Sequence, residues 1–104
     1  MQFIASDTIG LFYEDRFEIY SLNDSNKITK RLDKPYAVQS GMRLFAVPQA
    51  IDHTVNMFFE EPHPGKRTFG LWCVEVQLLT ESTKISTPYK IYDIMSSLKR
   101  LLHL

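Results

Sequence analysis

The sequence predicts an α+β fold: an antiparallel, strand-rich meander or partly closed barrel of about five to seven strands, followed by one amphipathic C-terminal helix. Two patterns lead to this prediction. Between residues 2 and 80, apolar and polar side chains alternate at the period of two that extended strands impose. Between residues 88 and 103, apolar side chains recur at helical spacing. With 104 residues, 44% of them hydrophobic, the chain fits a single domain over residues 1–104.

The first part of the chain contains runs of aromatic and β-branched residues separated by turn residues. Such runs predict strands at residues 2–5, 9–13, 16–22 and 27–32. The second and third runs lie close enough to form a β-hairpin around Glu14-Asp15. After the third run, the side chains of Asn23 to Asn26 can hydrogen-bond to their own backbone, which favours a turn.

The middle of the chain is less regular. Residues 36–47 alternate as a strand only if Ser40-Gly41 forms a bend. Residues 53–60 fit a strand and also a helical face, and we expect the strand. Residues 61–67 contain two prolines and a glycine, which prevent regular pairing and predict an exposed loop.

The richest apolar segment, TFGLWCVEVQLLTE, covers residues 68–81 and holds the single Trp and the single Cys. Its apolar residues fall on both sides of a strand at the start and on one side at the end. This pattern is typical of a central strand whose last residues have one face exposed to solvent. One side carries Trp72, Val74, Val76 and Leu78, and the other carries Phe69, Leu71 and Cys73. We expect Trp72 and Val74 to form the sheet face against which the C-terminal helix packs.

The predicted helix covers about residues 88–103. Ser86-Thr87 can cap it, and Pro88 suits its first turn. Its apolar face consists of Ile91, Ile94, Met95, Leu98, Leu101 and Leu102. Seven strands closed by a C-terminal helix is also the architecture of a pleckstrin-type barrel, which is the alternative fold. Phosphoinositide capture in such a barrel would lack its cations here, because the turn Ser6-Asp7-Thr8 is not basic.

Composition excludes several classes of function. Twelve Lys and Arg balance twelve Asp and Glu, so the basic excess typical of general nucleic-acid or anionic-membrane binders is missing. One cysteine cannot form an internal disulfide, and inside an apolar run Cys73 is expected to be a buried hydrophobe. With no signal-peptide pattern and no apolar run of about twenty residues, we expect a cytoplasmic protein, of a cell or an infected host, that does not bind membranes.

No motif in the chain carries a specific chemistry, so we expect no catalytic residue, no metal and no cofactor. Asp52-His53 and Glu60-Glu61-Pro62-His63 hold metal-binding side chain types, but their spacing matches no standard ligand pattern, and surface positions explain them. A small metal-dependent hydrolase remains an alternative function. An enzyme would show His53 or His63 facing a carboxylate in a pocket.

Nucleic acid is the alternative partner. Cations near an aromatic residue can track phosphates and stack on bases. The candidate patch consists of Lys27, Lys30, Arg31, Lys34 and Arg43, near Tyr36. A charged edge strand also keeps sheets from pairing edge to edge, so a single-stranded nucleic-acid-binding domain is only the second hypothesis.

The preferred hypothesis is a small non-enzymatic binding or regulatory protein that acts through protein–protein contacts, and its size suggests a viral or phage accessory protein. Its partner would be another protein or a second copy of itself. Helix residues turned away from the sheet and the proline-rich loop are the expected contacts. These candidate partner-binding residues are Tyr89, Tyr92, Met95, Leu102, Pro62 and Pro64.

Overall fold

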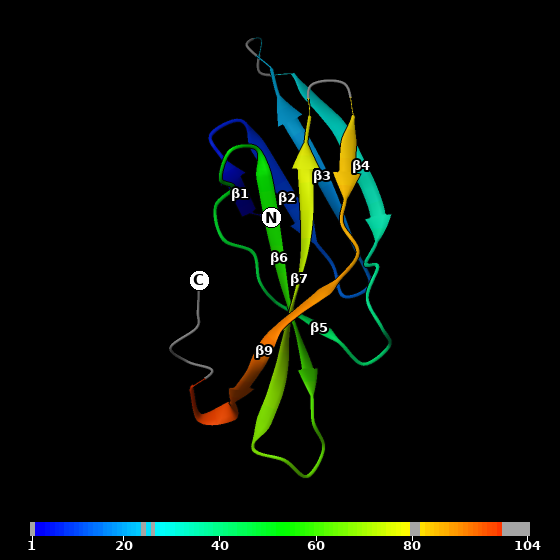
Figure 1. Ribbon diagram of the computed structural model, residues 1–104. Helices are drawn as coiled ribbons and strands as arrows, with labels where there is room; N and C mark the ends of the chain where they lie inside the picture. The colour runs from blue at the N-terminus through cyan, green and yellow to red at the C-terminus, as the bar shows by residue number, and fades with distance from the viewer. Residues whose placement is uncertain (1, 24, 26, 80–81, 99–104) are drawn as a thin grey trace.

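The structure is a computed structural model that describes residues 2–23, 25, 27–79 and 82–98, and these form nine strands in two antiparallel sheets (Figure 1). The first sheet has the order β1 (Gln2–Ala5), β2 (Thr8–Phe12), β3 (Arg16–Leu22) and β4 (Ile28–Pro35). The second sheet contains β5 (Arg43–Ala46), β6 (Thr54–Pro62), β7 (Thr68–Leu78), β8 (Thr83–Ile85) and β9 (Tyr89–Met95). Strand β7 is central, because β6 pairs with one of its edges and β8 and β9 share the other.

The α+β prediction is wrong, because none of the described residues lies in a helix of seven or more residues. The segment predicted as helix 88–103 forms β9, followed by a single 3₁₀ turn at residues 96–98; residues 99–103 lie outside the described part. The run Tyr-Lys-Ile-Tyr-Asp-Ile is rich in residues that favour strands, and the free edge of β7 supplies a partner for its backbone. Pairing in the sheet therefore outweighs a helical spacing of apolar residues.

A β-bulge explains why that spacing misleads. The register between β7 and β9 shifts between Leu71 and Trp72, so that Tyr92 lies opposite Leu71 while Lys90 lies opposite Trp72. Ile91 is the extra residue in β9. An irregular strand of this kind breaks the period of two that would have identified it in the sequence.

The two sheets pack face to face around the main hydrophobic core. The alternation of Trp72 and Val74 on one side of β7 is confirmed, but this side faces the first sheet and not a helix. Next to it, the stacked rings of Phe17 and Tyr36 and the edge of Phe59 join the two layers. The buried core consists of Ile4, Phe17, Ile19, Leu32, Val47, Val55, Met57, Phe59, Val74, Val76 and Leu78.

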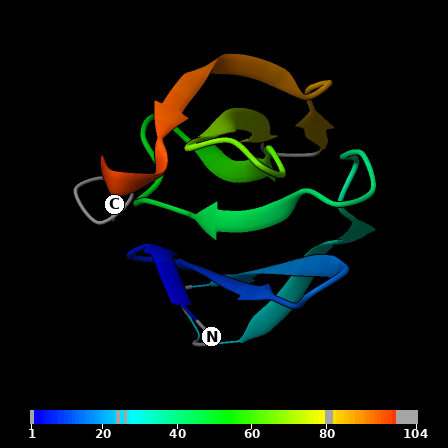
Figure 2. The same ribbon diagram turned by 90° about the horizontal axis from the view of Figure 1, so that it is seen from below.

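A second, smaller core lies on the opposite face of the second sheet. Ile94 of β9 is buried there with Phe69 and Leu71 of β7. Phe45 and Phe58 pack against these three residues. In the view of Figure 2, β9 arches over β6 and β7 on the side farthest from the four-stranded sheet. Only one side of β9 is therefore covered.

The remaining strand predictions are partly confirmed. The strand 2–5, the hairpin of 9–13 and 16–22, and the strands at 27–32 and 68–81 all correspond to observed strands. Predicted strand 36–47 is reduced to β5, because the segment before Arg43 crosses between the two sheets. The count of five to seven strands and the pleckstrin-type alternative are wrong, since nine strands lie in two sheets without a closing helix in the described part.

Candidate functional site

The exposed apolar side chains of the molecule are concentrated on and just after β9. Ten large hydrophobic side chains are exposed among the described residues, and five of these ten lie between residues 89 and 98. We call these five the β9 surface: Tyr89, Ile91, Tyr92, Met95 and Leu98. Tyr92 and Met95 are the most open of them, with 54% and 56% of their surface accessible. This concentration of exposed apolar side chains in one segment makes it the candidate contact site.

The strand that carries this surface is held by few side chains. Of the seven residues of β9, only Ile94 is buried. At the start of the strand, the Tyr89 hydroxyl donates a hydrogen bond of 2.8 Å to the Glu75 carboxylate. The pKa of Tyr89 is raised by its hydrogen bond with Cys73 and then by Glu75. Burial raises the pKa of the Cys73 thiol, which lies opposite Tyr89 and under β9.

Most of the predicted partner-binding residues lie on strands and not on the predicted helix. Pro62 lies opposite Phe69, and Phe69 lies opposite Ile94, so the end of β6 and the end of β9 flank the same part of β7. Pro64 is exposed in the loop that follows Pro62. Four of the six predicted residues, namely Tyr89, Tyr92, Met95 and Pro62, thus lie on β6 and β9 at either side of β7. Leu102 lies outside the described residues.

Sequence reasoning missed Ile91 and Leu98 as exposed residues. Both were assigned to the packed face of the helix, whereas both are exposed. The one signal that could have separated them from Ile94 is the β propensity of the segment, which would have placed Ile91 and Ile94 on different sides of an extended chain.

A polar network borders the β9 surface. The His63 Nε2 atom lies 3.5 Å from a Glu61 oxygen and 4.0 Å from an Asp93 oxygen, so it stands between β6 and β9. The Lys90 ammonium lies 2.9 Å from the same Asp93 oxygen and lowers the pKa of that carboxyl. The Trp72 indole N–H donates to the same Glu61 oxygen at 3.2 Å. Protein donors thus already engage both carboxylates.

This network meets one condition that was set for an enzyme, because His63 faces carboxylates beside a hollow of about 230 Å³. The other ring nitrogen of His63, Nδ1, lies 3.2 Å from the Thr68 hydroxyl. His63 directly follows β6 and Thr68 begins β7, so this contact spans the base of the hairpin loop. No group of three His, Cys, Asp or Glu side chains in the described ranges is arranged to hold a metal ion. His63 therefore links the two ends of the hairpin loop through Thr68 and lies near Asp93 of β9.

The second histidine lies in a separate cleft of about 270 Å³ with Asp7, Arg31 and Asp52. Asp52 and His53 form a tight turn with positive φ angles of 50° and 63°, and Ile51 and Thr54 exchange two backbone hydrogen bonds across it. Asp and His are among the residues that tolerate this conformation best. The turn therefore has a local explanation as the start of β6.

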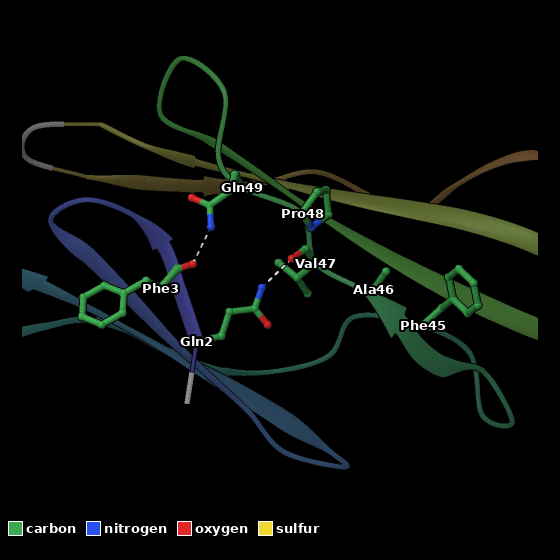
Figure 3. Close-up of a pocket in the computed structure, with 7 residues that line it drawn as sticks. All are labelled: Gln2, Phe3, Phe45, Ala46, Val47, Pro48 and Gln49. Carbon is green, nitrogen blue, oxygen red and sulfur yellow. Dashed lines mark hydrogen bonds between the residues drawn. The ribbon is translucent and has the colours of Figure 1, made fainter. Parts of the chain in front are cut away.

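A further hollow, of about 760 Å³, is a groove between β1 and residues 45–49 (Figure 3). Its two walls are joined by side chain amides: Gln2 donates to the Val47 carbonyl, and Gln49 donates to the Phe3 carbonyl at 2.9 Å. The Ala50 N–H adds a backbone bond to the Ile4 carbonyl. The groove thus lies where β1 of the first sheet meets the segment after β5 of the second sheet, and no pattern in the sequence indicated it.

The predicted nucleic-acid patch does not form one open cationic surface. Lys30 lies 3.0 Å from Glu18 and 3.4 Å from Asp33. The hydrogen bond from Lys30 holds the Glu18 pKa at about 2, and the same contact raises the pKa of Lys30 to about 12. Arg31 donates to the Leu79 carbonyl. Lys27 and Lys34 are exposed at the two ends of β4.

Arg43, the last residue of the predicted patch, belongs to a different sheet from the other four. It lies on β5 and pairs with Glu60 at 3.3 Å. The five cations therefore lie on two different sheets, and two of them, Lys30 and Arg43, form ion pairs with carboxylates of their own chain.

No protein-family model, no curated protein and no solved structure matches this chain. Among the described residues, no helix has the length and apolar character needed to cross a bilayer.

Proposed function

We propose that this chain is a small binding protein without enzymatic activity and that it contacts another protein through the β9 surface. The observation that supports this proposal is the concentration of exposed apolar side chains at residues 89–98. Aromatic residues and Met are enriched in the centres of protein interfaces, and Tyr89, Tyr92 and Met95 belong to these types. Pro62 lies opposite Phe69 of β7, which in turn lies opposite Ile94 of β9, so the end of β6 can contribute to the same contact.

The charge distribution favours a protein over a nucleic acid as partner. Binding to nucleic acid depends on cations that are available to neutralise phosphates. Here Lys30 and Arg43 face carboxylates of their own chain. Strand β9 carries one cation, Lys90, and that cation is paired with Asp93.

The test is affinity capture from the native cell with the full chain as bait. The Tyr92→Ser, Met95→Ser double variant removes two side chains of the β9 surface. The matched control is Ile28→Ser with Ile51→Ser, which removes two even more exposed apolar side chains (59% and 67%), one on β4 and one in the turn before β6. Truncating a hot-spot residue near the centre of an interface costs about 2 kcal/mol or more, which lowers affinity about 30-fold.

The expected result is a protein that wild type and control retain and that the β9 variant loses. Equal loss with both variants, or equal retention, would place the contact elsewhere and contradict the proposal. If the bait instead retains oligonucleotides in a salt-dependent manner, and Lys30→Glu with Arg31→Glu abolishes that retention, nucleic-acid binding replaces protein binding.

A further inference from the structure

We infer that the hollow beside His63 binds a phosphate monoester, presented by a phosphorylated Ser or Thr side chain of the protein partner. This inference rests on the proposed function, because it names a chemical group of the partner that contacts the β9 surface. Three observations support it: the donors that line the hollow, the charge of its lining, and its position next to the β9 surface. We call this hollow of about 230 Å³ the basic pocket.

The basic pocket is lined by hydrogen-bond donors that come from separate parts of the second sheet. Arg43 begins β5 and Thr68 begins β7, whereas Ser96 directly follows β9. The other two donors belong to the loop between β6 and β7. The five donor side chains of the lining are Arg43, His63, Lys66, Thr68 and Ser96. A ligand group with several acceptor oxygens can therefore be bound from more than one side.

Local backbone structure holds the loop residues at the basic pocket. The Lys66 N–H donates to the His63 carbonyl at 3.0 Å across a proline and Gly65. Gly65 has a φ angle of 76°, and proline followed by a glycine with positive φ is typical of a type II turn. The two ends of this turn line the same hollow. The Ser96 N–H donates to the Arg67 carbonyl at 2.8 Å, which fixes the residue after β9 against the loop.

The lining of the basic pocket carries more positive than negative charge. Arg43 and Lys66 are cations, and Glu60 is the one carboxylate among the described residues that line the pocket. Glu60 lies 3.3 Å from the Arg43 guanidinium, but the Arg43 side chain is 69% exposed and has five N–H donors, so donors remain for a ligand. No ion pair within the described part of the chain includes Lys66. Its ammonium is therefore available to an anion.

Two further carboxylates lie near the basic pocket and already have partners. Glu61 and Asp93 face the Nε2 atom of His63 at 3.5 and 4.0 Å. Glu61 accepts a hydrogen bond from the Trp72 indole, and Asp93 pairs with Lys90. Neither carboxylate lines the pocket. Their donors offset the repulsion that they would otherwise exert on a bound anion.

The size and charge of the basic pocket favour a small group with two negative charges. Pockets that enclose drug-sized ligands measure about 300–1,000 Å³, so a hollow of about 230 Å³ suits a smaller group. A phosphorylated Ser or Thr carries about −1.5 to −2 charges at pH 7 and three strong acceptor oxygens, and it pairs with Arg. A carboxylate of the partner has a single charge and two oxygens, so it would engage fewer of the donors.

The basic pocket adjoins the β9 surface. Ser96 directly follows Met95 and lies two residues before Leu98, and these two apolar side chains are exposed. A partner that covers Met95 and Leu98 therefore lies beside the pocket. One segment of the partner can place apolar side chains on the β9 surface and a phosphoryl group among the cations. Recognition of a phosphorylated residue by basic side chains is a recurring mode of peptide binding.

The test is an NMR titration of the isotope-labelled full chain with two small probes. N-acetyl-phosphoserine amide supplies the phosphate monoester, and N-acetylglutamate amide supplies a carboxylate for comparison. The Arg43→Gln, Lys66→Gln variant removes the two cations of the basic pocket. The matched control is Lys27→Gln with Lys34→Gln, which makes the same change in net charge at two exposed cations of the first sheet, one just before β4 and one near its end.

The inference predicts saturable shifts of the amide signals of residues 63, 66–68 and 96 with the phosphoserine probe. The pocket variant should bind this probe at least about ten-fold more weakly, because hydrogen bonds to a charged group are lost, and the control variant should stay within about two-fold of wild type. The carboxylate probe should bind about ten-fold more weakly than the phosphoserine probe. Absence of saturable shifts at these residues, equal weakening by both variants, or equal affinity for the two probes would overturn the inference.

Phosphatase treatment of the lysate before affinity capture tests the source of the phosphate group. Wild type should then retain about ten-fold less of its partner. Retention that phosphatase leaves unchanged would overturn the inference and leave the proposed function intact, since the contact at Tyr92 and Met95 does not require phosphate. Failure of the proposed function would instead appear as equal capture by the Tyr92 and Met95 variant and its control, so the two failures are distinguishable.

Discussion

Replacing Ile94 by Ala should loosen β9 without unfolding the rest of the chain. Ile94 is the buried side chain of β9, and it packs in the small core formed with Phe69 and Leu71. Truncating a buried Ile to Ala costs about 2–5 kcal/mol, and the lower end applies because this core is small and lies at the edge of the sheet. The free energy of opening β9 should therefore fall by about 2 kcal/mol, which raises the population of the opened state about 30-fold.

The unique cysteine provides the assay. Cys73 is 1% exposed and lies opposite Tyr89, so a thiol reagent reaches it when β9 opens. We expect Ile94→Ala to increase the rate of Cys73 modification about 30-fold in buffer without denaturant. The matched control is Ile91→Ala in the same strand. Ile91 is 36% exposed, so its loss affects mainly strand propensity, and we expect about a two-fold change.

The comparison of these two variants distinguishes a strand from a helix at residues 89–95. On the predicted helix, Ile91 and Ile94 would share the packed face and their substitutions would have similar effects. Equal acceleration of Cys73 modification by the two variants would therefore refute the strand assignment. Modification that occurs only under conditions where the whole chain unfolds would refute the separate opening of β9.

Two further predictions concern the main core and the first sheet. Trp72→Ala should lower the free energy of unfolding by about 3 kcal/mol, because it removes a half-buried ring packed on the main core. Urea titrations followed by circular dichroism measure this change. Unchanged stability with lost partner binding would instead make Trp72 a contact residue. The Glu18 pKa is about 2 in the folded chain against an ordinary value of 4.5, because Lys30 hydrogen-bonds to the carboxylate. The folded value is the lower one, so the stabilisation is complete above the unfolded pKa and is lost as pH falls from about 4.5 toward about 2. Urea titrations over this range should show a smaller loss of stability for Glu18→Gln than for wild type, and an identical slope would contradict the ion-pair network.

Much of the fold was predictable from short-range patterns. The hairpin of β2 and β3 follows from two aromatic runs around Glu14-Asp15, and the two apolar sides of β7 follow from strict alternation. These strands are regular, so the period of two survives in the sequence. Which face of β7 meets which layer was not predictable, because both faces begin apolar and the sequence does not say where the other sheet lies.

The C-terminal segment was predicted wrongly for a physical reason. Ile91 and Ile94 are three residues apart in an irregular strand with a bulge, and that spacing is also the spacing of a helix face. Tyr89, Tyr92 and Met95, which were predicted to bind a partner, are exposed, since large side chains remain exposed when the segment has only one layer to pack against. The groove between β1 and residues 45–49 was not foreseen, because it depends on contacts more than forty positions apart in sequence.

The most direct test of the β9 surface is hydrogen exchange on the chain with and without its captured partner. A partner that contacts this surface should slow amide exchange over residues 89–95 and leave β4, residues 28–35, unchanged. Slower exchange over β4 with no change over residues 89–95 would show that the partner binds the four-stranded sheet and would contradict the assignment of the site.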